Sequence, residues 1–281
     1  MLQDKGSPES GNMAKIGAGF NYDESDIHRR YAEGRRIQPW VMAMWLEAMG
    51  RHIPRSQVQT AVDLGCGTGR FSAALCRYFS ARVIALDPSG NMLRVAAGNA
   101  TNGLLFVQAR AAEMPLRDGC ADLVFASMVW HHIPDQHAAS REIARVLRPG
   151  GYLGIRTPTL EALDSELYLR FFPTARRLNE QIMPARQDLL TCLTDCGLQL
   201  IHHGIVRHPQ NNSLREYAER VALRAFSDLA AISEEEFRRG MEELRQYCAT
   251  APQQEIAADV DLFVCRTPLR TSSPFPKEIS G

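Results

Sequence analysis

Three glycines and an aspartate have the types and the spacing of a nucleotide-binding site. Gly65, Gly67 and Gly69 follow the short apolar run of residues 60–64 and precede a helical pattern. Glycines at such a turn let the backbone bend sharply and approach a ligand without intervening side chains, and free N–H groups at a helix start attract acceptor atoms. Asp87 ends the next apolar run, where a carboxylate can accept both hydroxyls of a ribose. The segment therefore predicts a nucleotide site.

The glycine spacing discriminates between cofactors. Gly69 follows Gly67 by two residues, whereas the dinucleotide fingerprint has three. Asp63 stands inside the first apolar run, where a purely structural strand residue would be apolar. The pattern therefore disfavours a nicotinamide dinucleotide.

Five ordered motifs over residues 58–157 are similar to those of class I S-adenosylmethionine (SAM) dependent methyltransferases. They are residues 63–69, 86–89 with Met92, 111–115, 130–135 and 145–151. Within this class the chain resembles the small-molecule branch, which includes ubiquinone/menaquinone-type and natural-product methyltransferases. The resemblance implies SAM as the cofactor, S-adenosylhomocysteine as its product, and a seven-stranded, mostly parallel sheet whose last strand is antiparallel.

The resemblance also implies roles for individual residues. Asp63 would hold the amino group of SAM, Asp87 would take the ribose hydroxyls, and Met92 would pack on the adenine. The backbone N–H of Ala111 would face an adenine nitrogen. Arg110 stands where the family usually has an acid, and because Arg has no acceptor, a backbone carbonyl or a water would replace that contact. The expected cofactor-binding residues are Asp63, Gly65, Cys66, Gly67, Gly69, Asp87, Pro88, Met92, Arg110, Ala111, Ala112, Met128, Tyr22 and Tyr31.

Tyr22 and Tyr31 resemble aromatic residues that close over the sulfonium in many family members, because a ring face attracts a cation. The same two residues also suit an ordinary amphipathic helix. The sequence leaves both interpretations open.

Two histidines are the candidates for catalysis. His131 and His132 follow the fourth apolar run, at the strand end where open α/β sheets bind ligands. A neutral imidazole there can accept a proton as the methyl group moves, and we favour His131 by its similarity to natural-product methyltransferases. The alternatives are that the pair only shapes the loop, and that transfer proceeds by positioning alone.

Composition excludes several classes of protein. Lys plus Arg and Asp plus Glu both number 32, so the chain lacks the basic excess that nucleic-acid binding needs. It has no apolar run long enough to span a membrane and no apolar signal-peptide core, so we expect a cytoplasmic protein. Cys192 and Cys196 have a spacing that can ligate a metal, but with no second suitable pair we expect none. The sequence does not predict the oligomeric state.

Strands alternate with helices from residue 56 to residue 157, which predicts an α/β, Rossmann-like sheet. We expect a flexible tail over residues 1–20, an N-terminal helical lid over 21–55, and a SAM-binding methyltransferase domain over 56–281 with a helical insertion at 207–250. The expected strands are residues 60–64, 82–86, 104–107, 122–126, 152–156, 198–206 and 260–265.

The function that follows is SAM-dependent methylation of a small organic acceptor, natural-product or quinone/isoprenoid-like. The alternatives are methylation of a protein or a nucleic acid, an NAD-binding oxidoreductase, and a non-catalytic scaffold with the same fold. Calorimetry with SAM and with NAD separates the methyltransferase from the oxidoreductase.

Overall fold

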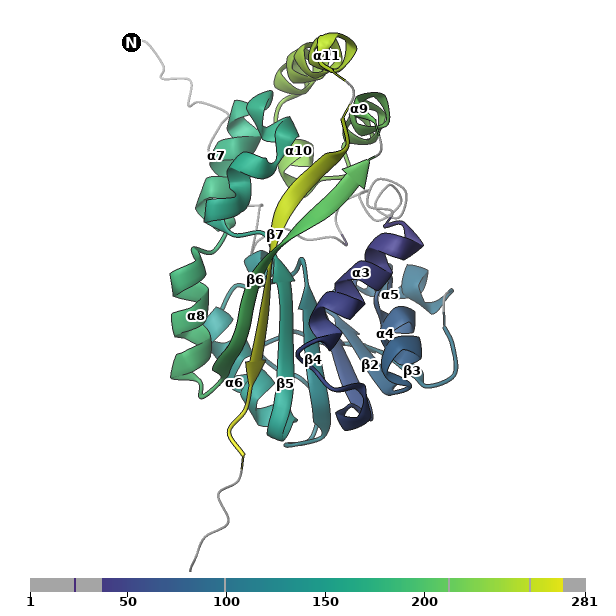
Figure 1. Ribbon diagram of the computed structural model, residues 1–281, viewed down its shortest axis with the longest axis vertical. Helices are drawn as coiled ribbons and strands as arrows, with labels where there is room; N and C mark the ends of the chain where they lie inside the picture. The colour runs from purple at the N-terminus through teal and green to yellow at the C-terminus, as the bar shows by residue number, and fades with distance from the viewer. Residues whose placement is uncertain (1–22, 24–36, 99, 212, 253, 270–281) are drawn as a thin grey trace, which may run out of the picture.

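A seven-stranded sheet forms the centre of the molecule (Figure 1). The computed structural model describes Asp23 and residues 37–98, 100–211, 213–252 and 254–269. The strand order is β3-β2-β1-β4-β5-β7-β6, and every pair is parallel except the two that β7 forms with β5 and β6. This arrangement confirms the expected fold class. The strands are β1 Thr60–Leu64, β2 Arg82–Asp87, β3 Leu104–Gln108, β4 Ala121–Ser127, β5 Leu147–Thr157, β6 Gln199–Asn211 and β7 Ile256–Arg266.

Helices cover both faces of the sheet, which is why the central strands are almost continuously buried. On one face α3 (Pro39–Gly50) and α4 (Ser72–Phe79) pack around Trp45 and Leu75. On the other face α6 (Gln136–Val146) and α8 (Arg186–Asp195) pack around Ile143 and Leu193. A further helix, α5 (Gly90–Ala97), contacts β2 and β3.

All seven expected strands are present, and β5, β6 and β7 are each several residues longer than expected. Strands β6 and β7 pair from Gln199 opposite Arg266 out to Asn211 opposite Ile256. The sequence around Pro209 does not read as a strand, because proline cannot donate a ladder hydrogen bond. Strand β6 is at the edge of the sheet, where that donor is not needed.

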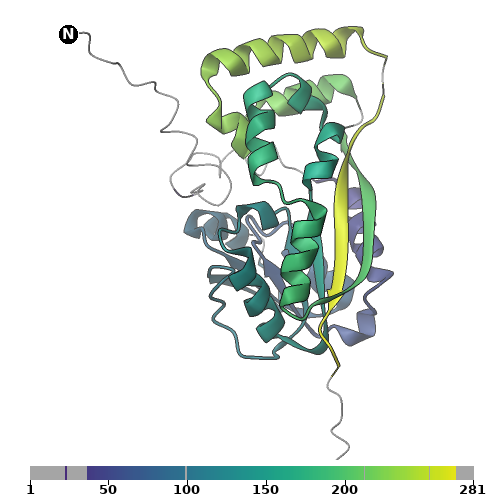
Figure 2. The same ribbon diagram turned by 90° about the vertical axis from the view of Figure 1, so that its left-hand side faces the viewer.

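A helical cap lies above the carboxyl ends of the strands (Figure 2). It combines two insertions that share one apolar core, which includes Tyr168, Phe172, Tyr217 and Leu244. The first insertion, between β5 and α8, holds η4 (Leu160–Ser165), η5 (Leu167–Arg170) and α7 (Pro173–Ile182). The second, between β6 and β7, holds α9 (Leu214–Ala222), α10 (Ser227–Ala231) and α11 (Glu234–Thr250). The sequence patterns predict helices over residues 160–178, 213–229 and 233–248, and the sequence prediction placed only the last two of these in an insertion.

The expected continuous helix over residues 213–229 is wrong, because the chain breaks at Arg224. Its φ is +50°, in the left-handed region that ends helices. The guanidinium of Arg224 donates to the carbonyl oxygens of Leu229 and Ile232, at 2.7 and 2.5 Å. These bonds fix the turn between α9 and α10.

The sequence also predicts helix caps at Ser89 and Ser233, and both predictions are confirmed. The hydroxyl of Ser89 accepts from the N–H of Met92 at 3.1 Å and caps α5. The hydroxyl of Ser233 accepts from the N–H of Glu236 at 3.1 Å and caps α11. The expected tail over 1–20 and residues 21, 22 and 24–36 of the expected lid, which include Tyr22 and Tyr31, lie outside the described residues.

Candidate cofactor-binding and active site

A cavity of about 640 Å³ opens at the carboxyl ends of β1, β2, β3 and β4. This is the edge at which open parallel sheets bind their ligands. Its wall comes from the glycine loop after β1, from the ends of β2 and β3, and from the segment after β4. A volume of this size suits a cofactor-sized molecule.

The three glycines of the loop adopt left-handed backbone conformations for different reasons. Gly65, Gly67 and Gly69 have φ values of +67°, +55° and +74°. A side chain on Gly65 would collide with Val129, since an added Cβ would lie 2.2 Å from its Cγ2 atom. An added Cβ on Gly67 would meet no atom within 4 Å, and this glycine lines the cavity. The loop thus packs tightly on one side and leaves open space on the ligand side.

The carboxylate of Asp87 holds the glycine loop against the end of β2. One oxygen accepts the N–H of Gly67 at 2.8 Å, and the other accepts the N–H of Ser89 at 2.9 Å. Burial raises the pKa of Asp87, while these two hydrogen bonds favour its charged form. Since a carboxylate oxygen accepts more than one hydrogen bond, the group fits two ribose hydroxyls.

Asp63 is buried at the end of β1 and also lines the cavity. The hydroxyl of Ser72 donates to its carboxylate at 2.6 Å. Burial, aided by the negative charge of Asp87, raises the pKa of Asp63 to about 7. Ser72 and the positive charge of Arg70 oppose that shift. A cationic amino group at this place would restore the charged form.

Cys66 lies inside the loop but has no feature of a nucleophile. Burial and the charges of Asp63 and Asp87 raise the pKa of its thiol. Its Sγ atom lies 3.7 Å from the carbonyl oxygen of Gly67. It therefore stays a neutral thiol that fills space in the turn.

The residues expected around the adenine come together at the ends of β2 and β3. Pro88, Met92, Arg110, Ala111 and Ala112 all line the cavity. Arg110 forms an isolated antiparallel bridge with Glu113, which brings a carboxylate onto the same wall. Glu113 is the acid nearest in sequence to the position that Arg110 occupies.

Met128, which follows β4, has a φ of +56° although it is not a glycine. Its N–H donates to the carbonyl oxygen of Arg156 at 2.7 Å, and the residue lines the cavity. Left-handed conformations of bulky residues cost free energy and occur at ligand sites. The sequence predicted the location of Met128 but not this backbone conformation.

The two histidines occupy a short 3₁₀ helix, η3 (Trp130–His132), directly after Met128 and Val129. Their ring centroids lie 4.2 Å apart. His132 lines the cavity, whereas His131 is buried and is not among the described residues of its wall. The geometry therefore favours His132 over His131 as the residue that meets a ligand.

Two features of the site were missed from the sequence. Asp23 lines the cavity and accepts from the hydroxyl of Ser89 at 2.5 Å and from the N–H of Asn91 at 3.0 Å. The hydrogen bond from Ser89, the backbone hydrogen bonds from Asn91 and Gly90, and the positive charge of Arg94 lower the pKa of Asp23, while burial opposes them. No pattern in the sequence indicates that Asp23 contacts Ser89, which lies 66 positions further along the chain.

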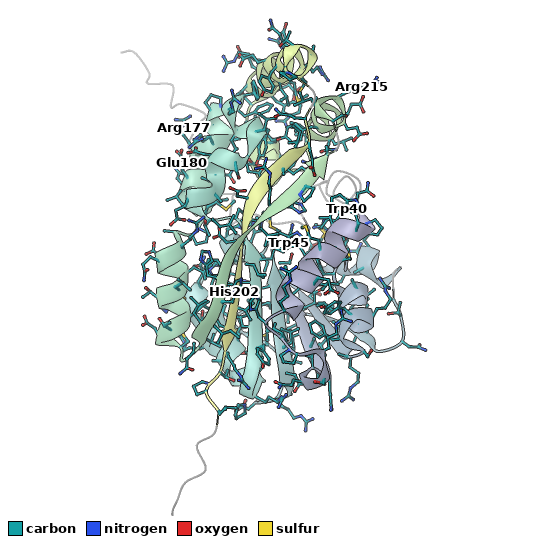
Figure 3. All side chains as sticks on the ribbon, viewed as in Figure 1. Trp40, Trp45, Arg177, Glu180, His202 and Arg215 are labelled. Carbon is teal, nitrogen blue, oxygen red and sulfur yellow. The ribbon has the colours of Figure 1, made fainter. Side chains whose placement is uncertain are left out.

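The second missed feature is a buried guanidinium at the end of β5. Arg156 donates to the hydroxyl of Ser127 at 3.0 Å, and its charge lies 4.5 Å above the ring of Trp45. Trp45 in turn donates to Nδ1 of His208 at 3.0 Å, which joins α3 to β6. Trp45 is labelled on α3 in Figure 3. Because Ser127 lines the cavity, this cluster supports the wall at β4. The feature of the sequence that could have identified Arg156 is its position as a charged residue at the end of an apolar strand.

Among the described residues no group of three or more His, Cys, Asp or Glu side chains could hold a metal ion. Cys192 lies 3.3 Å from the hydroxyl of Ser140, away from the cavity. In the described part of the chain, no helix has the length and apolar character needed to cross a membrane.

Comparisons with known proteins agree with this geometry. Residues 62–155, about one third of the chain, match the family model described as "Methyltransferase domain". This match covers the glycine loop, Asp87 and both histidines, and it confirms the resemblance to class I SAM-dependent methyltransferases. This segment of the chain is similar to a methyltransferase domain.

Curated relatives share the same part of the chain. A trans-aconitate 2-methyltransferase of Azoarcus sp. is 38% identical over 38% of this chain and 42% of its own length. A malonyl-[acyl-carrier protein] O-methyltransferase of Methylococcus capsulatus is 34% identical over 43% of this chain and 49% of its own length. The chain thus spans less than half the length of these two relatives.

A solved structure extends the likeness to most of the fold. A protein of an antibiotic biosynthesis pathway from Anabaena variabilis superposes with a TM-score of 0.66 at 17% identity. The alignment covers 78% of this chain and 96% of that chain. This likeness establishes the shared fold.

Proposed function

We propose that this protein is a SAM-dependent methyltransferase that acts on a small organic acceptor, natural-product or quinone/isoprenoid-like. The observation that carries the proposal is the buried carboxylate of Asp87, which bonds to the N–H of Gly67 inside a cavity at the carboxyl ends of the parallel strands. The methyltransferase-domain match supports the reaction class. The relatives named for trans-aconitate and malonyl-[acyl-carrier protein] support a small acceptor group.

The described residues fit SAM at each of its parts. Asp87 would accept the ribose hydroxyls, and Met92 with Ala111 would enclose the adenine at the ends of β2 and β3. Asp63 would hold the amino group at the end of β1. The order of these strands in the sheet, β3-β2-β1, matches the order of adenine, ribose and methionine in the cofactor. We expect Tyr22 and Tyr31 to close over the sulfonium.

When bound, SAM supplies an electrophilic methyl group. The chain's main contribution is to hold the acceptor atom in line with that group, which supplies much of the rate of a two-reactant step. Met128, Val129 and His132 form the cavity wall after β4, where this alignment would be set. Where the acceptor atom carries a proton, the imidazole of His132 would accept it, and His131 would support that ring from 4.2 Å.

Calorimetry with S-adenosylhomocysteine tests the proposal. We expect wild-type protein to bind this nucleoside and to ignore NAD. Asp87→Asn should weaken binding at least ten-fold, because the ribose loses a charged double acceptor. Asp118→Asn, an exposed aspartate outside the cavity, is the matched control and should bind as wild type does.

Failure of the wild type to bind S-adenosylhomocysteine would refute the proposal, and binding of NAD in its place would favour the oxidoreductase. Binding should be followed by a transfer assay over a panel of small carboxylic acids, phenols, amines and isoprenoid quinones. Binding without transfer across that panel would favour a non-catalytic scaffold. Transfer to protein or nucleic acid alone would place the enzyme in the macromolecular branch.

We further propose that the protein works in the cytoplasm and does not bind nucleic acid. All seven cysteines are free thiols, as a reducing compartment maintains them. The equal numbers of acidic and basic residues support the absence of nucleic-acid binding. Cell fractionation and a filter-binding assay at low salt test the two statements.

A further inference from the structure

Charged side chains on the cavity wall are arranged by strand. Arg110 and Glu113 follow β3, Asp87 ends β2, Asp63 lies near the end of β1, and Arg70 follows the glycine loop. Asp135 lies after β4, and Asp23 also lines the wall. Strand β1 and the glycine loop after it thus place an acidic side chain, Asp63, and a basic one, Arg70, on the cavity wall only seven positions apart in the sequence.

The two charges of the loop act on each other. The positive charge of Arg70 lowers the pKa of Asp63 against the effect of burial. Asp63 is buried, and Arg70 is partly exposed in the turn that precedes α4. Asp63 therefore offers a buried hydrogen-bond acceptor to the cavity, and Arg70 offers a donor nearer the solvent.

An α-amino acid has the complementary charges. Its ammonium needs an acceptor, its carboxylate needs a donor, and the two groups are attached to one carbon. The amino-acid part of SAM is joined through sulfur to the ribose. Since the ribose belongs at β2, the amino-acid part extends over β1 toward β4 in the sheet order β3-β2-β1-β4.

We propose that Arg70 binds the carboxylate of the amino-acid part of SAM, so that Arg70 and Asp63 together hold its zwitterion. This inference rests on the proposed function. The guanidinium forms paired hydrogen bonds with a planar carboxylate, a geometry that lysine cannot reproduce. Arg70 is then a cofactor-binding residue that the sequence motifs did not identify.

Arg110 does not serve this role. It follows β3, two strands from β1, and neighbouring strands are about 4.8 Å apart, so its backbone is about 10 Å away across the sheet. It also lies beside Ala111, on the adenine side of the cavity. The assignment of the carboxylate to Arg70 therefore follows from the strand order.

Three ligands and three variants test the proposal by calorimetry. The ligands are SAM, decarboxylated SAM, which keeps the amine, and 5′-methylthioadenosine, which lacks the amino-acid part. The variants are Arg70→Ala, Arg70→Lys and the control Arg77→Ala, an exposed arginine on α4 outside the cavity. Circular dichroism verifies that each variant is folded.

We expect Arg70→Ala to weaken SAM binding about ten- to a hundred-fold, the range for a hydrogen-bonded charged group. The same variant should bind decarboxylated SAM and 5′-methylthioadenosine as wild type does. Wild type should prefer SAM over decarboxylated SAM by a similar factor. Arg70→Lys should recover part of the loss, and Arg77→Ala should show none.

Three results would overturn the proposal. Equal loss for all three ligands would mean that Arg70 only supports the loop. Equal loss for SAM and decarboxylated SAM, with 5′-methylthioadenosine unaffected, would mean that Arg70 acts only by keeping Asp63 charged. Unchanged SAM affinity would remove Arg70 from the site. Wild-type protein that binds none of the ligands would instead refute the proposed function itself.

Discussion

A carboxyl group buried as deeply as that of Asp63 ionises only at a cost in solvation free energy. The side chain is 2% exposed, and its pKa is raised to about 7 by burial, with a smaller contribution from the nearby charge of Asp87. The charged form is what an ammonium group requires. Binding of an amino-acid ligand is therefore linked to loss of a proton from Asp63.

This linkage predicts that affinity for S-adenosylhomocysteine rises with pH. With a pKa of about 7, the ionised fraction of Asp63 grows roughly eight-fold between pH 6 and pH 7.5, and affinity should follow it. Below pH 6 affinity should keep falling about ten-fold per unit, and above pH 8 it should level off. Calorimetry in a series of buffers measures the profile.

Two controls accompany this profile. Affinity for 5′-methylthioadenosine, which has no ammonium, should be much less dependent on pH. Asp63→Asn should remove most of the pH dependence for S-adenosylhomocysteine. A slope that persists in Asp63→Asn would assign the titration to another group.

The two histidines give a second prediction at the level of single residues. His132 lines the cavity and His131 does not, so we expect His132→Ala to lower turnover by about 10²–10⁴-fold and to leave SAM affinity nearly unchanged. His131→Ala should have the smaller effect on turnover. The rates are measured at saturating SAM with an acceptor found in the panel. Equal rates for wild type and His132→Ala would leave positioning as the catalytic device.

The site illustrates what residue types and spacing predict. The glycines, Asp63 and Asp87 were found because the turn geometry demands glycine and because a carboxylate inside an apolar strand needs a reason. Asp23 and Arg156 were not found, because their roles come from contacts with residues far along the chain. The sequence could not decide between His131 and His132, because the directions of two neighbouring side chains depend on the backbone conformation. The structure shows that these two residues lie in a 3₁₀ helix.

In the glycine loop, Gly65 and Gly67 serve different purposes, one in packing and the other in ligand binding. Gly65 packs against Val129, whereas Gly67 lies next to open space and bonds to Asp87. Both are left-handed, so alanine at either position costs about 1–2 kcal/mol in backbone conformation. Only at Gly65 does a steric collision add to this cost.

We therefore expect alanine at Gly65 to affect mainly the stability of the protein, and alanine at Gly67 to affect mainly ligand binding. Gly65→Ala should destabilise the protein by about 2–4 kcal/mol in denaturant unfolding, through overpacking as well as backbone strain. Gly67→Ala should cost less stability but weaken S-adenosylhomocysteine binding more, because the new methyl group projects into the cavity. Larger destabilisation by Gly67→Ala would contradict this division of roles.

The elements themselves were largely predictable. Each of the seven strands contains a short apolar run by which the sequence predicted it, and the helix caps at Ser89 and Ser233 follow from local chemistry. Boundaries failed where tertiary contacts decide them. Strand β6 continues through Pro209 because it pairs with β7, and the helix after Ser213 breaks because Arg224 bonds to carbonyls of the next segment.

At the scale of the whole molecule, the cap and the sheet are joined by the long β6–β7 ribbon. Its lower part pairs within the sheet, and its upper part reaches the apolar core that both insertions share (Figure 2). Asp261 on β7 is fully buried at this junction and accepts from Thr159 and Arg186, both at 2.7 Å. The sequence predicted the helices and strands of this region. It did not predict that the two insertions share one apolar core, because that core forms from residues far apart in the chain.

The position of β7 also has a consequence for synthesis of the protein. This strand is the last of the seven to leave the ribosome, yet it lies between β5 and β6 in the sheet. A nascent chain can therefore assemble the five parallel strands that carry the nucleotide pocket while β6 still has no neighbour to pair with. During translation the strands around the pocket can pair first, and the sheet is completed only when β7 enters between β5 and β6.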